Sequence, residues 1–352
     1  MLTTFAKKTF LALKNPYHTV IKVQPLIIDE AKEYYDRGSD VYYVGVKNTN
    51  VIPSSFIKQL QNAGCFWHTV DAGAHSGRAV DVTLQNPLTM RWMTGSSSGT
   101  ALNVLYGIND IGIGSDGGGS ILAPAACVNL FGFMSPLLPV RQIKKKSTDG
   151  IAMTPSTGVI TREWKPLIHV LNHCFAFSEN EKQPVSLVVP TQKSCINPFL
   201  DEYEYLNKQL MQQEKITIEE MDYPDKYGDR KPLIDFLKQP QLEGKIIVSI
   251  EGPVDRHGIG DSIFGQFDET TKQEQRASCK GLLRVVNMAG KSAVIIPMPE
   301  LGVGMLFICD STKPQIAAML EVASRFLQPR NALADRYFLN IDHHFQAGFL
   351  EE

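Results

Sequence analysis

The sequence predicts an α/β fold in which a mixed β-sheet is covered by helices on both faces. Helical and strand patterns alternate along the whole chain, as they do in proteins of this class. The 352 residues suffice to bury a sizeable core. Apolar residues make up 43% of the sequence and charged residues 20%, which is ordinary for a globular protein. No linker divides the chain, so we expect a single domain over residues 1–352.

The periodicity of apolar residues places the elements of the first half. Apolar positions at helical spacing over 25–37 predict a helix that Gly38 ends. The run DVYYVGVK at 40–47 predicts a buried strand. The mixed composition of 71–90 predicts a loop. By the same criteria we expect helices at 54–63 and 99–107, and strands at 65–70 and 111–115.

The second half continues the alternation. Its polar stretch 252–275 predicts a long loop of the kind that often covers a site. The remaining expected elements are helices at 161–175, 197–213, 269–288 and 313–328, and strands at 184–190, 245–251, 292–297 and 303–308.

Charge and cysteine usage narrow the class of protein. A formal net charge of −2 gives no long-range attraction to nucleic acid or to an anionic membrane, so neither partner is expected. The apolar segments 127–140 and 293–309 are interrupted by Pro, Gly or Glu, which argues against a membrane span. Six cysteines without metal-ligand spacing predict no metal site and a reducing compartment, so a cytoplasmic location is expected.

The segment 94–124 gathers Gly and Ser inside an apolar region, and three motifs can be found in it. The first is G-x-G-x-x-G at 112–117, the dinucleotide fingerprint. We reject it because no acidic residue follows about twenty positions on, and because Asp116 would place a negative charge beside a pyrophosphate. No cofactor is therefore expected.

The second motif is G-x-S-x-G at 95–99, the nucleophile elbow, with Ser97 as the nucleophile. This motif needs an acid and then a histidine later in the chain, and His343 could serve as the histidine. This interpretation stays open at the level of sequence.

The third interpretation uses the whole segment. Two Gly-rich turns that carry serines flank one helix and one strand. Gly117, Gly118 and Gly119 before Ser120 allow backbone N–H groups to point at a developing oxyanion, and a helix beginning near Ile121 would add its dipole. A serine nucleophile needs a base, and no histidine lies nearby in the sequence.

These turns resemble the amidase signature family, whose core reads roughly G-S-S-G-G-S and then G-x-D-x-G-G-S-I-R-x-P-A. The chain has GSSSG at 95–99 and GSDGGGSILAPA at 114–125, with Ser96 lying 24 positions before Ser120 as an ungapped match requires. The segment VGVKN at 44–48 resembles the family's strand that ends in its lysine. The resemblance implies the amidase signature fold.

The resemblance also implies a catalytic triad. Ser120 would be the nucleophile, and Ser96, held through a cis peptide, would relay its proton to Lys47. Desolvation by the surrounding apolar strand would lower the pKa of that lysine enough for it to act as a base. The chain is then a hydrolase of a carboxylic amide that works through an acyl-enzyme. The implied oxyanion hole and substrate contacts are Gly117, Gly118, Gly119 and Ser97.

Departures from the family pattern leave the amide substrate open. Leu122 and Met134 stand where the family usually has Arg and Lys, and Asn48 replaces an Asp. The expected partner is a small-molecule amide, and a homodimer is compatible with the sequence. Two alternatives remain, namely an amidotransferase-like subunit and an amidase-like binding protein of impaired activity.

Overall fold

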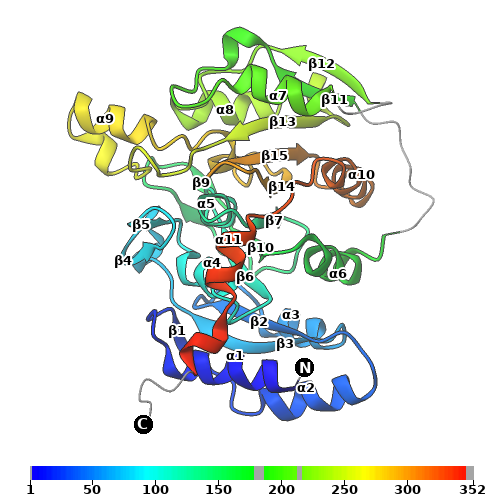
Figure 1. Cartoon of the computed structure of the whole chain (residues 1–352). Coiled ribbons are helices and arrows are strands. Elements are labelled where there is room, and N and C mark those ends of the chain that lie inside the picture. The colour runs from blue at the N-terminus through cyan, green and yellow to red at the C-terminus, as the bar shows by residue number, and fades with distance from the viewer. Residues whose placement is uncertain (1, 178–185, 212–215, 346–352) are drawn as a thin grey trace.

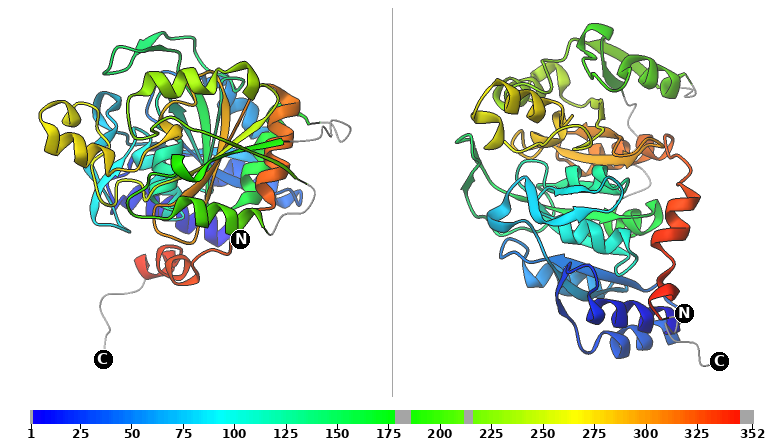
Figure 2. Two further views of the ribbon diagram at one scale, coloured as in Figure 1. Left: turned by 90° about the horizontal axis from the view of Figure 1, so that it is seen from above. Right: turned by 60° about the vertical axis from the view of Figure 1, so that its left-hand side comes forward.

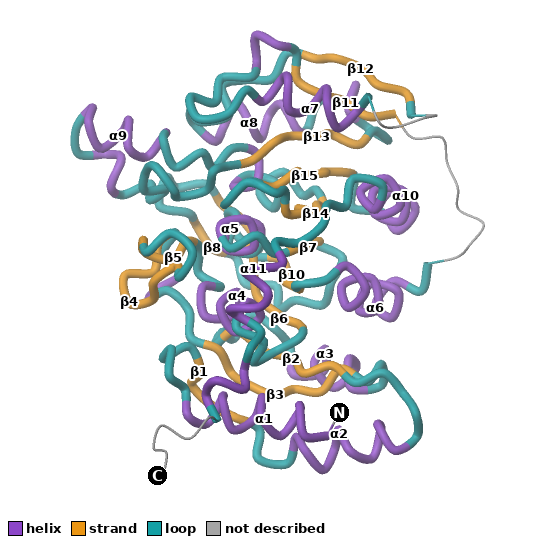
Figure 3. Tube along the Cα trace, in the orientation of Figure 1, coloured by secondary structure: helices purple, strands orange, loops and turns teal. Residues whose placement is uncertain are grey.

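A computed structural model describes residues 2–177, 186–211 and 216–345, and the described chain is built on one eleven-stranded mixed sheet (Figure 1). At one end the edge strand β1 is antiparallel to β3, and β3, β2 and β6 are parallel to one another. Antiparallel pairs fill the middle, and β13, β11 and β12 run parallel at the other end. Figure 3 shows this progression from β3 and β2 to β12. In spatial order the strands are β1 Val20–Val23, β3 Cys65–Asp71, β2 Tyr42–Lys47, β6 Ile111–Asp116, β10 Ser156–Thr161, β7 Phe131–Ser135, β14 Ser292–Pro297, β15 Gly304–Cys309, β13 Ile246–Glu251, β11 Ser186–Pro190 and β12 Thr217–Met221.

Two short hairpins lie outside this sheet. One joins β4 (Val80–Asn86) to β5 (Arg91–Thr94), and the other joins β8 (Lys145–Lys146) to β9 (Ala152–Met153). Both lead into loops that line the site described below.

Helices cover both faces of the sheet, which confirms the predicted α/β class. On one face α4 packs on β6 and α5 on β7, whereas α3, α6 and α10 pack on the opposite face (Figures 1 and 2). Each face has its own cluster of buried apolar side chains, so the sheet is the centre of the core. In chain order the helices are α1 Leu2–Lys14, α2 Ile27–Asp36, α3 Ser54–Gln61, α4 Ser98–Leu105, α5 Leu122–Cys127, α6 Trp164–Phe175, α7 Glu202–Leu210, α8 Arg230–Leu237, α9 Glu269–Arg276, α10 Lys313–Ser324 and α11 Ala332–Phe338.

Most expected elements are found within a few residues of their predicted bounds, and three expectations are wrong. The segment 71–90 is not a plain loop, because it holds β4. The predicted helix at 269–288 ends at Arg276, and a 3-10 turn, η5 (Leu282–Arg284), follows. The helix expected from 197 begins only at Glu202, because the Asp201 side chain caps it by accepting the Glu204 N–H. Residues 184–185 and 212–213 of two predicted elements lie outside the described residues.

Glycines at the middle of the sheet allow α5 to approach it closely. Gly158 on β10 pairs with Gly114 on β6, and the Ile121 side chain at the start of α5 covers both. A Cβ atom at Gly158 would lie 2.6 Å from the Phe133 carbonyl oxygen and 2.7 Å from Ile121 Cγ1. The close approach of sheet and helix therefore leaves no room for a side chain at this position.

We expect Gly158→Ala to lower the free energy of unfolding by about 1–3 kcal/mol, because backbone and helix must move apart to admit the methyl group. Urea unfolding followed by circular dichroism measures this change. Thr217→Ala on the exposed edge strand β12 is the control, with an expected change below about 0.5 kcal/mol. Equal unfolding midpoints for the two variants would contradict the packing argument.

Candidate active site

Lys47 lies at the carboxyl end of β2, next to the Gly-rich turns. Because β2 and β6 are parallel, their carboxyl ends meet at the same edge of the sheet, where open α/β folds bind their ligands. The Lys47 Nζ donates hydrogen bonds to Ser96 Oγ at 2.6 Å and to Ser115 Oγ at 3.1 Å. The lysine and the first of the two serine turns are therefore in direct contact.

Burial changes the acid–base behaviour of this lysine. Lys47 is only 8% exposed. Loss of solvation lowers the pKa of its amine from 10.5 to about 7; the Asp116 charge opposes this shift and the Lys145 charge adds to it. At neutral pH a sizeable fraction of Lys47 is therefore uncharged and able to accept a proton.

Ser96 follows β5 and precedes α4 in a tight turn. Gly95 makes this turn with a φ of +72°, and its N–H donates to the Ala79 carbonyl at 2.7 Å. The Gly95–Ser96 bond is trans, since the cis bond of the described residues is Gly252–Pro253. The expectation of a cis peptide at Ser96 is therefore wrong. The positive φ of Gly95 turns the chain instead, and Ser96 Oγ reaches Lys47 without a cis bond.

The turn at 117–120 is held by Asp116, the last residue of β6. Its carboxylate accepts the N–H of Gly119 and the N–H of Ile121, each at 2.7 Å. This is the backbone-capping role typical of Asp in a loop. It commits the Gly119 N–H, whereas the N–H groups of Gly117, Gly118 and Ser120 have no acceptor among the described residues. Those three donors are available to a bound oxyanion.

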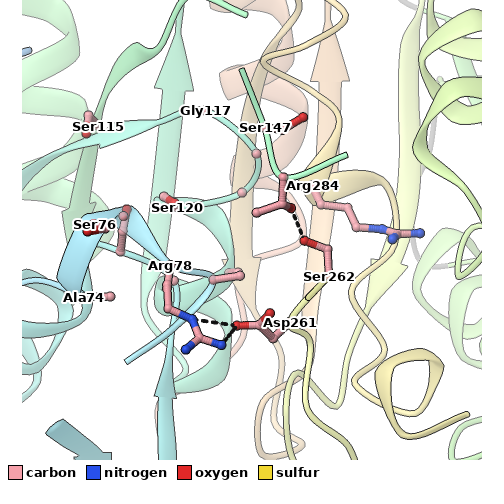
Figure 4. A pocket seen from close by; sticks show the side chains of 18 of the residues that line it. Ala74, Ser76, Arg78, Ser115, Gly117, Ser120, Ser147, Asp261, Ser262 and Arg284 are labelled. Atoms are coloured by element: carbon pink, nitrogen blue, oxygen red, sulfur yellow. Dashed lines mark hydrogen bonds and ion pairs between the residues drawn. The ribbon is translucent and has the colours of Figure 1, made fainter. Parts of the chain in front are cut away.

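A cavity of about 1000 Å³ opens on these groups (Figure 4). Lys47, Ser96, Ser115 and the whole turn 117–120 line it. Ser120 is partly exposed there, and its Oγ has no hydrogen-bond partner among the described residues. The hydroxyl is thus accessible from the cavity.

Interactions between separate loops close the far wall of the cavity. Arg78 donates from Nη2 to Asp261 Oδ2 at 2.8 Å, and Thr148 hydrogen-bonds Ser262 (Figure 4). The loop after β13 that carries Asp261 and Ser262 belongs to the polar stretch expected to cover a site.

The nucleophile elbow interpretation gains no support from the placement of its residues. Ser97 is fully buried beneath Gly114 and does not line the cavity, and its Oγ has no hydrogen-bond partner in the described part of the chain. His343 lies near the C-terminus with Nδ1 facing the Asn340 carbonyl. The structure therefore brings Lys47, Ser96 and Ser120 to one cavity and leaves Ser97 outside it.

Sequence reasoning missed several groups that line the same cavity. Ser115, the second hydrogen-bond partner of Lys47, lies in the segment 114–125 that resembles the amidase signature, but nothing in the sequence singles it out. Arg230 on α8 and Arg284 on η5 also line the cavity, yet neither lies in a recognisable motif. The feature that marks these two arginines as functional is their positive charge inside a cavity, and this feature can be recognised only when the fold is known.

Comparisons with known proteins find similarity to amidases in sequence and in fold. The sequence profile of the Amidase family matches residues 73–195, which include both serine turns. Comparison with curated protein sequences finds no significant match.

Solved structures similar to this chain include several amidases. A bacterial aryl acylamidase of the amidase signature family is 15% identical over 92% of this chain and 93% of its own, with a TM-score of 0.62. The peptide amidase of Stenotrophomonas maltophilia is 13% identical over 93% of this chain and 95% of its own, with a TM-score of 0.61. The allophanate hydrolase of Kluyveromyces lactis is 14% identical over 93% of this chain and 70% of its own, with a TM-score of 0.61.

At such identities the structural likeness establishes the fold, and the fold is that of the amidase signature enzymes. Together with the profile match, this confirms the resemblance of the chain to the amidase signature family. Among the described helices, none is long and apolar enough to cross a bilayer.

Proposed function

We propose that this protein hydrolyses a carboxylic amide through an acyl-enzyme on Ser120, with Ser96 and Lys47 as the proton relay. The observation that carries the proposal is the hydrogen bond from buried Lys47 to Ser96 at a cavity into which Ser120 opens. A desolvated lysine with a pKa of about 7 is suited to act as a base at neutral pH.

The first step forms the bond between Ser120 Oγ and the carbonyl carbon of the amide. The Ser120 proton passes to Ser96, and the Ser96 proton passes to Lys47. When the C–N bond breaks, the proton returns along the same path to the leaving nitrogen, so the amine departs neutral. Water then attacks the acyl ester and gives one proton to the relay. When the bond between the acyl carbon and Ser120 Oγ breaks, the relay returns that proton to Ser120 Oγ, and the carboxylic acid is released.

Backbone donors stabilise the oxyanion in both steps. The N–H groups of Gly117, Gly118 and Ser120, which have no acceptor among the described residues, line the cavity beside the nucleophile and would bind the negative oxygen. Loss of one such donor in a comparable site costs about 10²- to 10³-fold in kcat. The Asp116 carboxylate accepts the Gly119 and Ile121 N–H groups and so holds the turn in one conformation, which would keep the oxyanion donors in place.

A serine-directed fluorophosphonate tests the proposal without knowledge of the substrate. We expect stoichiometric labelling that maps to Ser120 by peptide mass spectrometry, because the relay activates this hydroxyl. Hydrolysis of aliphatic, aromatic and urea-type amides, followed by release of ammonia or amine, should accompany labelling. An unlabelled Ser120 in a folded protein that also releases no amine would refute the proposal.

A further inference from the structure

The charged residues that line the cavity are strongly unbalanced. Asp261 is the one carboxylate among the described lining residues, and it is paired with Arg78. Besides Lys47, the cations that line the cavity are Arg78, Lys145, Lys146, Lys280, Arg230 and Arg284. Lys280 pairs with Asp255 and Arg230 with Asp149, two carboxylates outside the lining, so the excess of positive charge rests on Lys145, Lys146 and Arg284. A cavity with low-dielectric walls and an excess of one charge concentrates ligands of the opposite charge.

Arg230 is the cation placed next to the catalytic turn. It begins α8, and its side chain is 12% exposed. Its Nη2 lies 3.9 Å from the position that a Cβ atom at Gly118 would occupy. Its Nη1 pairs with Asp149 Oδ1 at 3.1 Å, on the partly exposed loop between β8 and β9. One edge of the guanidinium is therefore held in place while Nη2 is directed toward the turn.

Arg284 fixes the loop from which Arg230 projects. Its Nη2 donates to the Lys226 carbonyl at 3.0 Å and also to the Gly228 carbonyl. Its Nε is buried, and none of the residues that the structure describes accepts a hydrogen bond from it. Burial, followed by the charge of the nearby Arg230, lowers the pKa of Arg284 to about 10. Two neighbouring guanidinium groups at one wall of the cavity would both gain from an anion placed beside them.

We propose that the cavity selects amides whose acyl group carries a carboxylate, which Arg230 binds while Arg284 acts as its positioning residue. The proposal rests on the proposed amide hydrolysis for the reaction, but the binding it describes is independent of turnover. Met153 and Met288 lie against Gly117 and Gly118. They offer an apolar wall to a short aliphatic chain between the amide carbonyl at Ser120 and the carboxylate at Arg230.

The binding test uses Ser120→Ala, which keeps the cavity and cannot turn substrate over. The probes are malonamate, succinamate and glutaramate, each compared by isothermal titration calorimetry with its neutral diamide. At least one carboxylate should bind about 10- to 100-fold more tightly than its diamide, because a guanidinium–carboxylate hydrogen bond is charge-assisted. Adding Arg230→Gln should remove that preference. Equal binding of every acid and its diamide would overturn the proposal.

Kinetics on the protein with Ser120 intact separate this inference from the proposed function. We expect Arg230→Gln to lower the ratio of kcat/KM for the preferred carboxylate to kcat/KM for its neutral diamide about 10- to 100-fold. The matched control is Arg37→Gln just after α2, where the arginine side chain is 64% exposed and pairs with Glu33. Hydrolysis of neutral amides with no preference for the carboxylates would refute the inference and leave the amidase assignment standing. Carboxylate binding in a protein that fluorophosphonate does not label would refute the amidase assignment and leave the inference standing.

Discussion

Replacing Ser120 with alanine is expected to lower kcat for amide hydrolysis about 10⁴- to 10⁶-fold and to abolish fluorophosphonate labelling. The variant has no oxygen to form the acyl-enzyme, so only binding and the oxyanion donors of the turn remain. Ser120 is partly exposed and its Oγ has no partner among the described residues, so its removal should leave the fold unchanged. Amine release under single-turnover conditions measures the loss.

Two further variants test whether the loss of activity in Ser120→Ala arises from the proton relay. Ser324→Ala on α10 is the matched control, since that serine is partly exposed, as Ser120 is, and its side chain bonds within its own helix. Its kcat should match the unmodified protein. Ser96→Ala should be impaired, and Ser96→Ala combined with Ser120→Ala should be no worse than Ser120→Ala alone, because residues that act as a unit are not additive. Full activity of Ser120→Ala would exclude it as the nucleophile.

The residues that we propose for catalysis could be singled out from the sequence because their signals are local. Lys47 ends a strand of apolar residues, and the serine turns carry glycines at fixed spacing. Because β2 and β6 pair in parallel, Lys47 at the end of β2 lies beside Ser115 near the end of β6. The trans bond before Ser96 could not be predicted in this way, because the conformation of Gly95 depends on how β5 enters the turn.

The missed elements lack a local signal. β7 and β10 are buried on both faces and hold glycines where α5 approaches, so neither shows the alternation typical of a half-exposed strand. Arg230 and Arg284 lie far from Ser120 along the chain, and only the packing of α8 and η5 brings them to the cavity. Sequence reasoning therefore finds the groups that we propose to react, whereas the groups that we infer to select the substrate become visible only in the fold.

The second large effect is expected at Lys47, where the activity should depend on a single deprotonation. Burial lowers the pKa of this amine to about 7, so kcat/KM should rise tenfold per pH unit below that value and level off above it. Lys47→Arg should be inactive at every pH, because a guanidinium stays protonated. A flat profile from pH 5 to 9, or an active Lys47→Arg, would exclude Lys47 as the base.

The same pKa shift predicts that the lysine destabilises the fold. Between pH 7 and 10.5 the unfolded chain holds the Lys47 proton more tightly than the folded chain, so this residue makes stability increase with pH over that window. Below pH 7 the whole penalty of burying the charge is present. Lys47→Met removes that penalty, although it also removes the hydrogen bonds to Ser96 and Ser115.

We therefore expect Lys47→Met to be inactive yet more stable than the unmodified protein by about 1–3 kcal/mol at pH 6, with the difference shrinking toward pH 10. Urea unfolding of the two proteins at pH 6, 8 and 10 measures it. Other titrating groups are common to both proteins, so the difference between them isolates Lys47. A difference that stays constant with pH would mean that Lys47 keeps its ordinary pKa in the fold. The lysine would then be a charged structural residue, and the relay from Ser120 would have no base at neutral pH.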